Sequence, residues 1–371
     1  MKQLITALTL LFIGSAQAGS FAARDDVQAF IADMADRHGL DGASLTVQFG
    51  KARPIPAVLK AIAPPTDPKI RSWQTYRQRF IEPRRTTAGL AFWQRHETAL
   101  ARAAALTGVP AEIIVSIIGI ETFYGKHLGR FDTFAALATL AFDYPPRADL
   151  FRRELESLLL LARDEGRSPD SYRSSYAGAI GLPQFLPSSI RAYAVDFDGD
   201  GHINLAGSTD DAIGSVANFL LRHGWEGGGP VSVKVGADPT AVRPLIDEGI
   251  LPQRSPREMR DFGVEVPAGA PEAPAALIDL VTPDSPTEYW LGYRNFYVIT
   301  RYNRSSFYAM AVFQFAEALK QQRLEPDQGP RDRGSAQAGA TATTALPPRR
   351  APTARASGQR PPSATGAPVR G

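Results

Sequence analysis

The sequence contains no cysteine. This absence excludes disulfide bonds, thiolate metal sites, a cysteine nucleophile and a lipid-modified cysteine. Long apolar runs are also scarce, because the stretch at residues 4–14 is too short to span a bilayer comfortably and no later stretch reaches spanning length. What the chain does have is 371 residues, 44% of them hydrophobic. That is enough to bury a substantial core, so global disorder is excluded.

The two ends of the chain differ in composition from its body. Residues 1–18 combine Lys2, the apolar stretch and a small-residue site at Ala16-Gln17-Ala18. This pattern is typical of a secretory signal peptide, with an N-terminal anchor helix as the alternative. Residues 325–371 are rich in Pro, Ala, Gly, Ser, Thr and Arg and contain no aromatic residue, so we expect a disordered tail. The folded region is therefore predicted to span residues 19–324.

The basic character of the chain lies at its ends. The sequence pI is about 9.1 and the net charge is +3. Residues 331–371 hold seven Arg and one Asp, and the predicted signal peptide holds Lys2. The tail therefore carries +6 and the signal peptide +1, and subtracting both from the net charge of +3 leaves −4 for residues 19–330. Nucleic acid is therefore not an expected partner. The tail is either a plain linker or an electrostatic contact to anionic surfaces.

Apolar periodicity predicts a mainly helical body. Helices are expected at residues 25–39, 84–106, 111–124, 133–142, 146–165, 210–223 and 305–320. The first is expected to begin with Asp25 and Asp26 as its cap. A loop is expected at 53–70, strands at 231–235 and 276–281, and a strand-like stretch at 286–302. The fold class is thus α+β, mainly α, with a small β-containing insert at about 229–300.

One glutamate lies in an unusually apolar helix. Glu121 shares a face with Ile113 and Ile117. A carboxyl group there loses hydration, so its pKa should rise. It can then donate a proton near neutral pH, as the departure of a sugar oxygen requires. This window alone favours the alternative, in which Glu121 lies at the helix end and pairs with Lys126 or Arg130 in solvent.

Two further segments favour a site around this glutamate. Residues 174–189 form a loop of small and polar residues whose glycines allow a ligand to approach the backbone closely. Residues 289–308 hold eight aromatic side chains among polar groups. Such clusters are usually core, but Tyr and Trp also offer the flat faces and polar tips that sugar rings need.

A third segment predicts a calcium site. Asp196, Asp198 and Asp200 occupy positions 1, 3 and 5 of an EF-hand-like loop, with glycine at position 6 and the backbone carbonyl of His202 at position 7. Position 12 is Gly207, where an EF-hand has a glutamate. The alternative is an Asp-rich turn without metal. A single loop favours structural Ca²⁺, and no motif for an organic cofactor is present.

Six segments, in order, resemble the lytic murein transglycosylase B family (glycoside hydrolase family 103, goose-lysozyme-like). They cover roughly residues 70–320. The segments are IIGIETFYG at 117–125, AALATLAFDY at 135–144, SYAGAIGLPQFLPSS at 175–189, YAVDFDGDGHINL at 193–205, DAIGSVANFLLRHGW at 211–225 and ITRYNRSSFYAMAV at 299–312. The resemblance implies a lysozyme-like helical catalytic core.

The resemblance also implies a reaction and its residues. Glu121 would be the lone acid/base, first protonating the bond oxygen between N-acetylmuramic acid and N-acetylglucosamine. It would then take a proton from the muramic C6 hydroxyl, giving a 1,6-anhydro sugar without consuming water. This explains why no second carboxylate stands out, as a hydrolase would require. The implied substrate-binding residues are Tyr76, Ser175, Gln184, Tyr302, Asn303 and Tyr308.

The chain departs from the family pattern at three places. The family completes its metal loop with a later aspartate, for which Asp210 and Asp211 both qualify. The following Ala-Ile-Gly favours Asp211, which makes the loop one residue longer than usual. Phe219 stands where the family usually has a cleft tyrosine, which puts one sugar hydrogen bond in doubt. Leu182-Pro183 replaces a more common Tyr-Gly pair.

The sequence therefore predicts a peptidoglycan lytic transglycosylase, a carbon–oxygen lyase of cell-wall turnover. We expect it to be periplasmic, soluble and not a lipoprotein, acting on glycan strands, with wall-synthesis proteins as further partners. One alternative is a non-catalytic peptidoglycan-binding or scaffolding protein. Another is a calcium-responsive regulatory protein.

Overall fold

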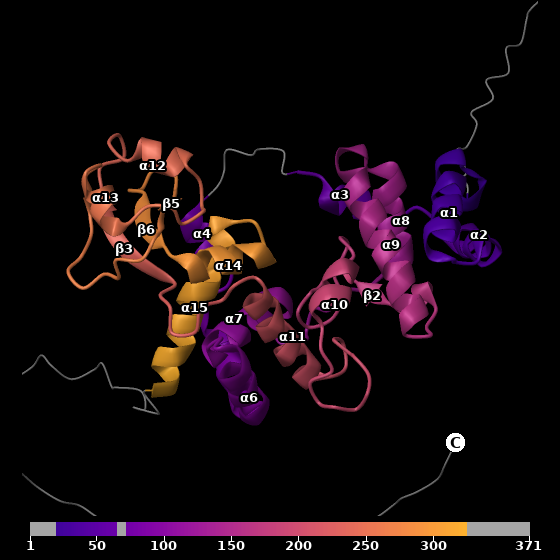
Figure 1. Ribbon diagram of the computed structural model, residues 1–371, viewed down its shortest axis with the longest axis horizontal. Coiled ribbons are helices and arrows are strands. Elements are labelled where there is room, and N and C mark those ends of the chain that lie inside the picture. Colours follow the sequence, from indigo (N-terminus) through magenta and orange to yellow (C-terminus); the bar gives the residue numbers. More distant parts are fainter. Residues whose placement is uncertain (1–19, 65–71, 325–371) are drawn as a thin grey trace, which may run out of the picture. The chain divides into compact units, whose positions relative to one another are not determined.

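The computed structural model describes residues 20–64 and 72–324. The predicted signal peptide (1–18) and tail (325–371) lie outside the described residues. The described part is mainly helical, with one two-stranded and one four-stranded antiparallel sheet (Figure 1). The α-helices are α1 (Asp25–His38), α2 (Gly42–Lys51), α3 (Pro56–Ile62), α4 (Trp73–Gln78), α5 (Pro83–Arg95), α6 (Glu97–Thr107), α7 (Ala111–Thr122), α8 (Thr133–Asp143), α9 (Ala148–Asp164), α10 (Pro187–Tyr193), α11 (Thr209–Arg222), α12 (Arg243–Asp247), α13 (Pro256–Arg260), α14 (Arg294–Tyr302) and α15 (Ser306–Leu324).

The short elements complete the described chain. The strands are β1 (Phe131–Asp132), β2 (Arg173–Ser174), β3 (Ser232–Ala237), β4 (Val264–Glu265), β5 (Ala276–Leu280) and β6 (Glu288–Gly292). The 3-10 turns are η1 (Phe21–Ala23), η2 (Pro145–Arg147) and η3 (Pro169–Ser171). The predicted strands at 231–235 and 276–281 correspond to β3 and β5, which confirms them.

Four local expectations are wrong. The N-cap of α1 is Arg24, and Asp25 and Asp26 lie in the first turn, where the positive end of the helix dipole favours them. The expected helix at 84–106 is two helices, because His96 leaves helical geometry with φ −113° and ψ 26°. The expected loop at 53–70 contains α3, which starts with proline at its first position. Half of the strand-like stretch at 286–302 is the helix α14.

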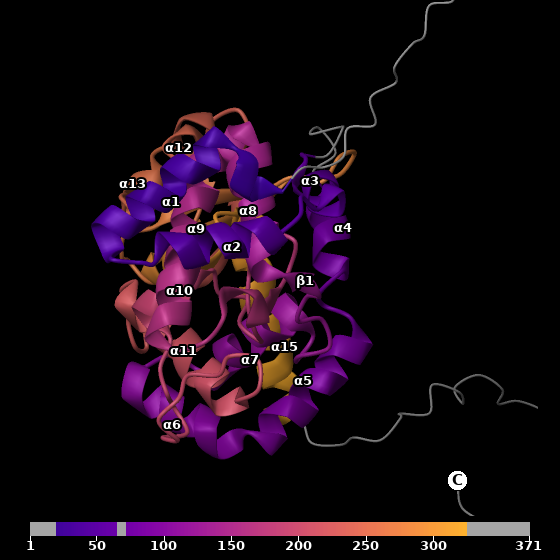
Figure 2. The same ribbon diagram turned by 90° about the vertical axis from the view of Figure 1, so that its right-hand side faces the viewer.

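The main core is built where α8 and α9 pack together and α7 packs against α15. The helices α1 and α2 cover α8 through aromatic contacts (Figures 1 and 2). The Phe30 and Phe142 rings lie 5.8 Å apart, and the Phe49 and Phe134 rings 4.8 Å apart. Burial of such rings is the largest favourable contribution to folding, which this cysteine-free chain must obtain from packing.

The insert is a four-stranded antiparallel sheet in the order β4-β3-β6-β5. In its register Val233 pairs with Leu291 and Ile278 with Trp290. Along β5, Leu277 enters a small second core with α12 and α13, whereas Ile278 enters the main core. Alternation along a strand explains this, since neighbouring side chains point to opposite faces. The sheet therefore has a hydrophobic layer on each side.

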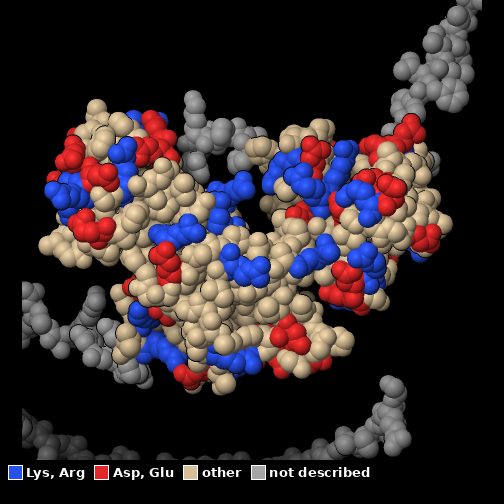
Figure 3. All heavy atoms as spheres, in the orientation of Figure 1, with Lys and Arg blue, Asp and Glu red and all other residues tan. Residues whose placement is uncertain are grey.

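Charge on the surface is mixed. Figure 3 shows Lys and Arg interspersed with Asp and Glu over the visible face. Among the described residues no single helix is long and apolar enough to cross a membrane. The pair α6 and α7 reaches the required length and composition only together, across a bend of 116°.

Candidate active site

Helix α7 carries Glu121 to the end of a buried apolar segment. Residues 113–120 are all buried, and Glu121 is the first residue after them that reaches solvent, in part. The Tyr308 hydroxyl donates a hydrogen bond of 2.6 Å to Glu121 Oε1. Burial raises the pKa of Glu121 to about 7, and the Tyr308 hydrogen bond opposes this rise. The carboxyl therefore keeps its proton to a higher pH than an ordinary glutamate does.

The alternative of a solvated ion pair is wrong. Across the described ranges Glu121 forms no ion pair, and Lys126 instead places its ammonium 4.6 Å from the Phe123 ring centre. After Glu121 the chain leaves the helix through two left-handed residues, Phe123 and Tyr124, with φ of 51° and 59°. This sharp exit directs the following cations away from the carboxyl group.

Tyrosines surround the carboxyl group. The Tyr302 and Tyr308 rings are stacked, with centres 6.3 Å apart and planes 12° apart. The Tyr302 hydroxyl donates to the Pro183 carbonyl at 2.6 Å. Burial, helped by the negative charge of Glu121, raises the pKa of Tyr76 to about 12 and those of Tyr302 and Tyr308 well above the ordinary value. Their hydroxyls therefore stay protonated and can donate hydrogen bonds.

The Gly-rich loop lies beside this group and is held rigidly. Ser175 accepts the Ala179 N–H through Oγ at 3.2 Å. The side chain of Gln184 donates to the Gly181 carbonyl at 2.9 Å and to the Leu128 carbonyl at 3.2 Å. Gln184 is itself left-handed, with φ 51°. Its fixed amide keeps the oxygen free to accept a hydrogen bond from a ligand.

A hydrogen bond joins the Gly-rich loop to α7, the helix that carries Glu121. Thr122 Oγ1, one residue after Glu121, donates to the Leu182 carbonyl at 3.0 Å. Gly181 has φ 75°, and a Cβ atom there would lie 2.5 Å from the Leu205 carbonyl oxygen, so only glycine fits. The loop and Glu121 are thus positioned as one unit.

The structure brings only part of the predicted set into contact. Tyr308 touches Glu121, and the pKa values of Tyr76 and Tyr302 respond to its charge. Among the described residues, no hydrogen bond joins Glu121 to any of the other three. These three are Ser175, Gln184 and Asn303. Asn303 is exposed at the end of α14.

A cavity of about 440 Å³ opens next to Gln184 and Tyr302. Phe219 lines it and packs against Tyr302 with ring centres 4.9 Å apart. Sequence reasoning missed two further lining residues, His223 and Arg301. The spacing of four between Phe219 on α11 and His223, the C-cap of that helix, was the available signal, since a helix brings residues four apart together. Their rings stack 4.1 Å apart.

Arg85 of α5 was also missed. Its Nη1 donates to the Gly119 carbonyl at 2.5 Å, two residues before Glu121. Its guanidinium lies over the rings of Phe80 and Phe123, at 5.3 and 4.7 Å from their centres. This contact holds the last turn of α7, and nothing in the local sequence around residue 85 indicates it.

The acidic loop forms a second group. Carboxylate oxygens of Asp196, Asp198 and Asp211 all lie within 4.8 Å of one another. Asp211 is fully buried, and its two oxygens accept the backbone N–H groups of Phe197 at 2.8 Å and Asn204 at 2.7 Å. Asp211, not Asp210, therefore completes the cluster.

The cluster fits a hard cation. Three carboxylates from one loop and the following helix supply the oxygen ligands that Ca²⁺ prefers. Asp200 is not in the cluster, since its carboxylate accepts the His202 N–H at 2.8 Å, and the His202 side chain is exposed. The glycines at 199 and 201 adopt φ of 81° and 90°, which lets the loop turn back on Asp196.

Known proteins are similar to this chain in sequence and in fold. The profile of the transglycosylase SLT domain family matches residues 22–317. The membrane-bound lytic murein transglycosylase B of Escherichia coli (strain K12) is 41% identical over 319 residues, covering 83% of this chain and 86% of that protein.

Solved structures of two relatives superpose on the chain. The soluble lytic transglycosylase SltB1 of Pseudomonas aeruginosa is 46% identical with a TM-score of 0.75, covering 80% of this chain and 99% of that one. The Escherichia coli lytic transglycosylase Slt35 in complex with calcium is 41% identical with a TM-score of 0.72, covering 83% and 96%. The predicted lysozyme-like, mainly helical fold is thereby confirmed.

Proposed function

The chain belongs to the transglycosylase SLT domain family and is a lytic murein transglycosylase, and we propose that it forms 1,6-anhydromuramic acid with Glu121 as its only acid and base. The observation that carries this proposal is a single carboxyl group with a pKa of about 7, hydrogen-bonded to Tyr308 at 2.6 Å. Such a group is protonated often enough to donate and ionised often enough to accept.

Glu121 serves both half-reactions in turn. Its protonated carboxyl donates to the glycosidic oxygen as the bond from that oxygen to the anomeric carbon of N-acetylmuramic acid breaks. The resulting carboxylate then accepts the proton of the C6 hydroxyl, whose oxygen bonds to the same anomeric carbon. The Tyr308 hydroxyl stabilises the carboxylate between these steps, since its hydrogen bond lowers the pKa of Glu121.

The glycan is held by the tyrosines and the fixed loop. Tyr76, Tyr302 and Tyr308 offer hydroxyls that remain protonated. The free amide oxygen of Gln184 and the hydroxyl of Ser175 face the reacting sugar rather than Glu121. Exposed Asn303 contacts a sugar at the rim, and Phe219 gives a ring face without a hydroxyl.

Calcium has a structural role in this proposal. Asp196, Asp198 and Asp211 hold the ion, whereas the Asp200 carboxylate of the sequence pattern lies outside their cluster and accepts the His202 N–H. Support comes from the cluster within 4.8 Å and from the calcium complex of Slt35. Bound Ca²⁺ supplies positive charge between the loop and the start of α11, the helix that carries Phe219. We propose a periplasmic location, with the relatives' murein activity as its support.

Product masses test the reaction. Purified sacculi are digested and the released muropeptides are weighed. Anhydro products, one water lighter than reducing-end sugars, are expected throughout the digestion. Reducing-end products alone would overturn the proposal in favour of a hydrolase.

A further inference from the structure

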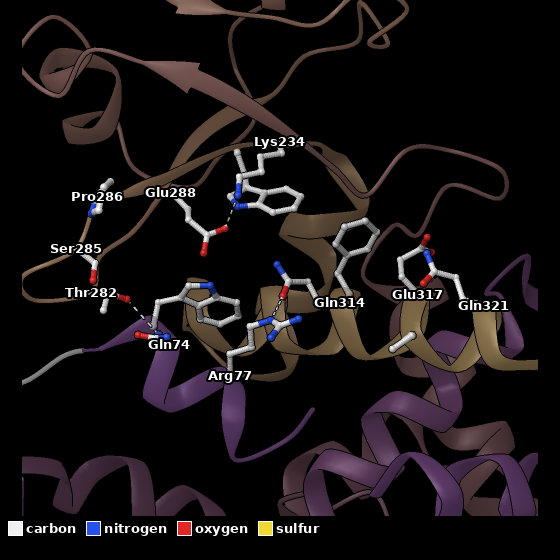
Figure 4. Close-up of a pocket in the computed structure, with 14 residues that line it drawn as sticks. Gln74, Arg77, Lys234, Thr282, Ser285, Pro286, Glu288, Gln314, Glu317 and Gln321 are labelled. Carbon is white, nitrogen blue, oxygen red and sulfur yellow. Dashed lines mark hydrogen bonds and ion pairs between the residues drawn. The ribbon is translucent and has the colours of Figure 1, made fainter. Parts of the chain in front are cut away.

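A second cavity lies between α4, α15 and the β-sheet insert (Figure 4). Its volume is about 800 Å³. Figure 4 shows Arg77 rising from α4, Gln314, Glu317 and Gln321 from α15, and Lys234 and Glu288 from the sheet. These side chains come from three separate parts of the chain and surround one hollow.

The cavity is distinct from the Glu121 site but shares two helices with it. On α4, Tyr76 packs against Phe80 on the side of the active site, while Arg77 lines the cavity. On α15, Tyr308 reaches Glu121, while Glu317, nine residues later, lines the cavity. Each helix therefore presents one face to each site.

Arg77 and Glu317 carry opposite charges in the cavity but do not pair with each other. Arg77 uses Nε to hold the Gln314 side-chain oxygen at 2.6 Å, and its two terminal nitrogens have no hydrogen bond among the described residues. Glu317, on the same helix as Gln314, also has no ion pair within the described ranges. Lys234 and Glu288, in contrast, pair with each other at 3.0 Å. Arg77 and Glu317 are thus available to a ligand.

The rest of the lining favours a peptide over a sugar. Sugars stack on open aromatic faces, but Trp73 is only 1% exposed, and the partly buried rings of Trp290 and Phe313 meet edge to face with centres 6.4 Å apart. The Lys234 ammonium lies 5.7 Å from the ring centre of Trp290. The Gln74 and Gln321 side chains offer amides instead, which can both donate to and accept from peptide groups. An unpaired cation and an unpaired carboxylate suit a ligand with charges of both signs.

We propose that this cavity binds a short peptide bearing free carboxylates and a free ammonium group, the kind of peptide that peptidoglycan strands carry. Arg77 binds the peptide carboxylate and Glu317 its ammonium. The identity of the peptide as a peptidoglycan substituent rests on the proposed function. Because the active site and this cavity flank α4, one strand can place its glycan at Glu121 and a peptide here.

Direct binding tests the proposal without relying on turnover. The full chain with Glu121→Gln is titrated calorimetrically with a synthetic tetrapeptide that contains a diamino acid with a free ammonium and ends in a free carboxylate. Saturable binding is expected. Arg77→Ala and Glu317→Gln, each added to that background, should weaken it by about tenfold or more, since each removes a charge-assisted contact. Arg84→Ala removes an exposed cation outside the cavity and should leave the dissociation constant unchanged.

A competition experiment locates the peptide. Saturation with a peptide-free oligosaccharide of N-acetylglucosamine should leave peptide binding intact if the two sites are separate. Displacement of the peptide by the oligosaccharide would overturn the proposal, as would equal affinity of all three variants or no binding at all. Circular dichroism and melting curves verify that each variant is folded. None of these outcomes depends on whether anhydro products form, so the two proposals fail independently.

Discussion

Two acidic residues of this molecule, Glu121 and Asp196, have opposite surroundings. Glu121 ends an apolar helix, has one hydroxyl donor, and has its pKa raised to about 7 by burial. Asp196 lies on an exposed loop, where backbone N–H groups, first that of Gly201, lower its pKa. The same functional group has its pKa raised in one place and lowered in the other. Its surroundings, not its chemistry, decide its role.

Asp211 is also buried, but its surroundings differ from those of Glu121. It is as inaccessible as any core residue, yet its oxygens accept backbone N–H groups of Phe197, Asp198 and Asn204. These donors satisfy carboxyl oxygens that water does not reach. Within residues 20–64 and 72–324, Glu121 accepts a hydrogen bond only from the Tyr308 hydroxyl. The number of hydrogen-bond donors thus separates the two sites.

Removing the acid should have the largest effect. Glu121→Gln keeps the shape and the acceptor for Tyr308 but cannot transfer a proton, so turnover should fall by roughly a thousandfold or more. The measurement is muropeptide release from sacculi, with a melting curve to confirm the fold. Activity within tenfold of the parent chain would refute the assignment of Glu121.

The pH dependence of stability should be the next largest effect. The folded pKa of Glu121 lies at about 7, above the ordinary glutamate value of 4.5. Its contribution to stability is therefore fully present below about pH 4.5 and is lost as the pH rises through about 7. Relative to Glu121→Gln, the parent chain should lose at most about 3 kcal/mol between these limits. Urea unfolding of both chains at pH 4.5 and 8 measures it, and a constant difference would contradict a raised pKa.

Asp211→Asn, in the acidic loop, should strongly destabilise the protein. It removes an acceptor for buried N–H groups and one oxygen of the proposed calcium site, so the free energy of unfolding should fall by about 2 kcal/mol. The rise in melting temperature on adding Ca²⁺ should disappear as well. Asp210→Asn is the matched control and should keep both properties. Equal behaviour of the two variants would show that Asp211 is not the ligand.

Tyr308→Phe should have the smallest of these effects. Loss of its hydroxyl removes the group that lowers the pKa of Glu121, so that pKa should rise further. The alkaline limb of the pH–rate profile should then move to higher pH, and the maximal rate should fall by about tenfold. Tyr302→Phe, whose hydroxyl bonds the Pro183 carbonyl, should not move the limb. If the alkaline limb does not move in Tyr308→Phe, the Tyr308 hydroxyl does not set the pKa of Glu121.

Sequence patterns succeeded where one physical effect was dominant. The apolar run before Glu121 and the periodicity of α9 and α11 predict their helices closely, because burial and helical spacing agree there. They failed where two effects competed. Apolar spacing continues across His96 from Phe92 to Leu100, so the break between α5 and α6 is invisible in the pattern. The aromatic residues of α14 favour a strand, but packing against the core makes them helical.

By itself, the sequence determined where the candidate groups lie along the chain. An isolated glutamate in an apolar helix, a run of aspartates with glycines and a Gly-rich loop each follow from local spacing and residue type. Only the tertiary structure decided how these groups act. The Tyr308 hydroxyl reaches Glu121 across 187 residues, and the choice of Asp211 over Asp210 depends on which oxygens converge on Asp196 and Asp198. Contacts between distant segments depend on how helices pack, and local sequence does not encode that geometry.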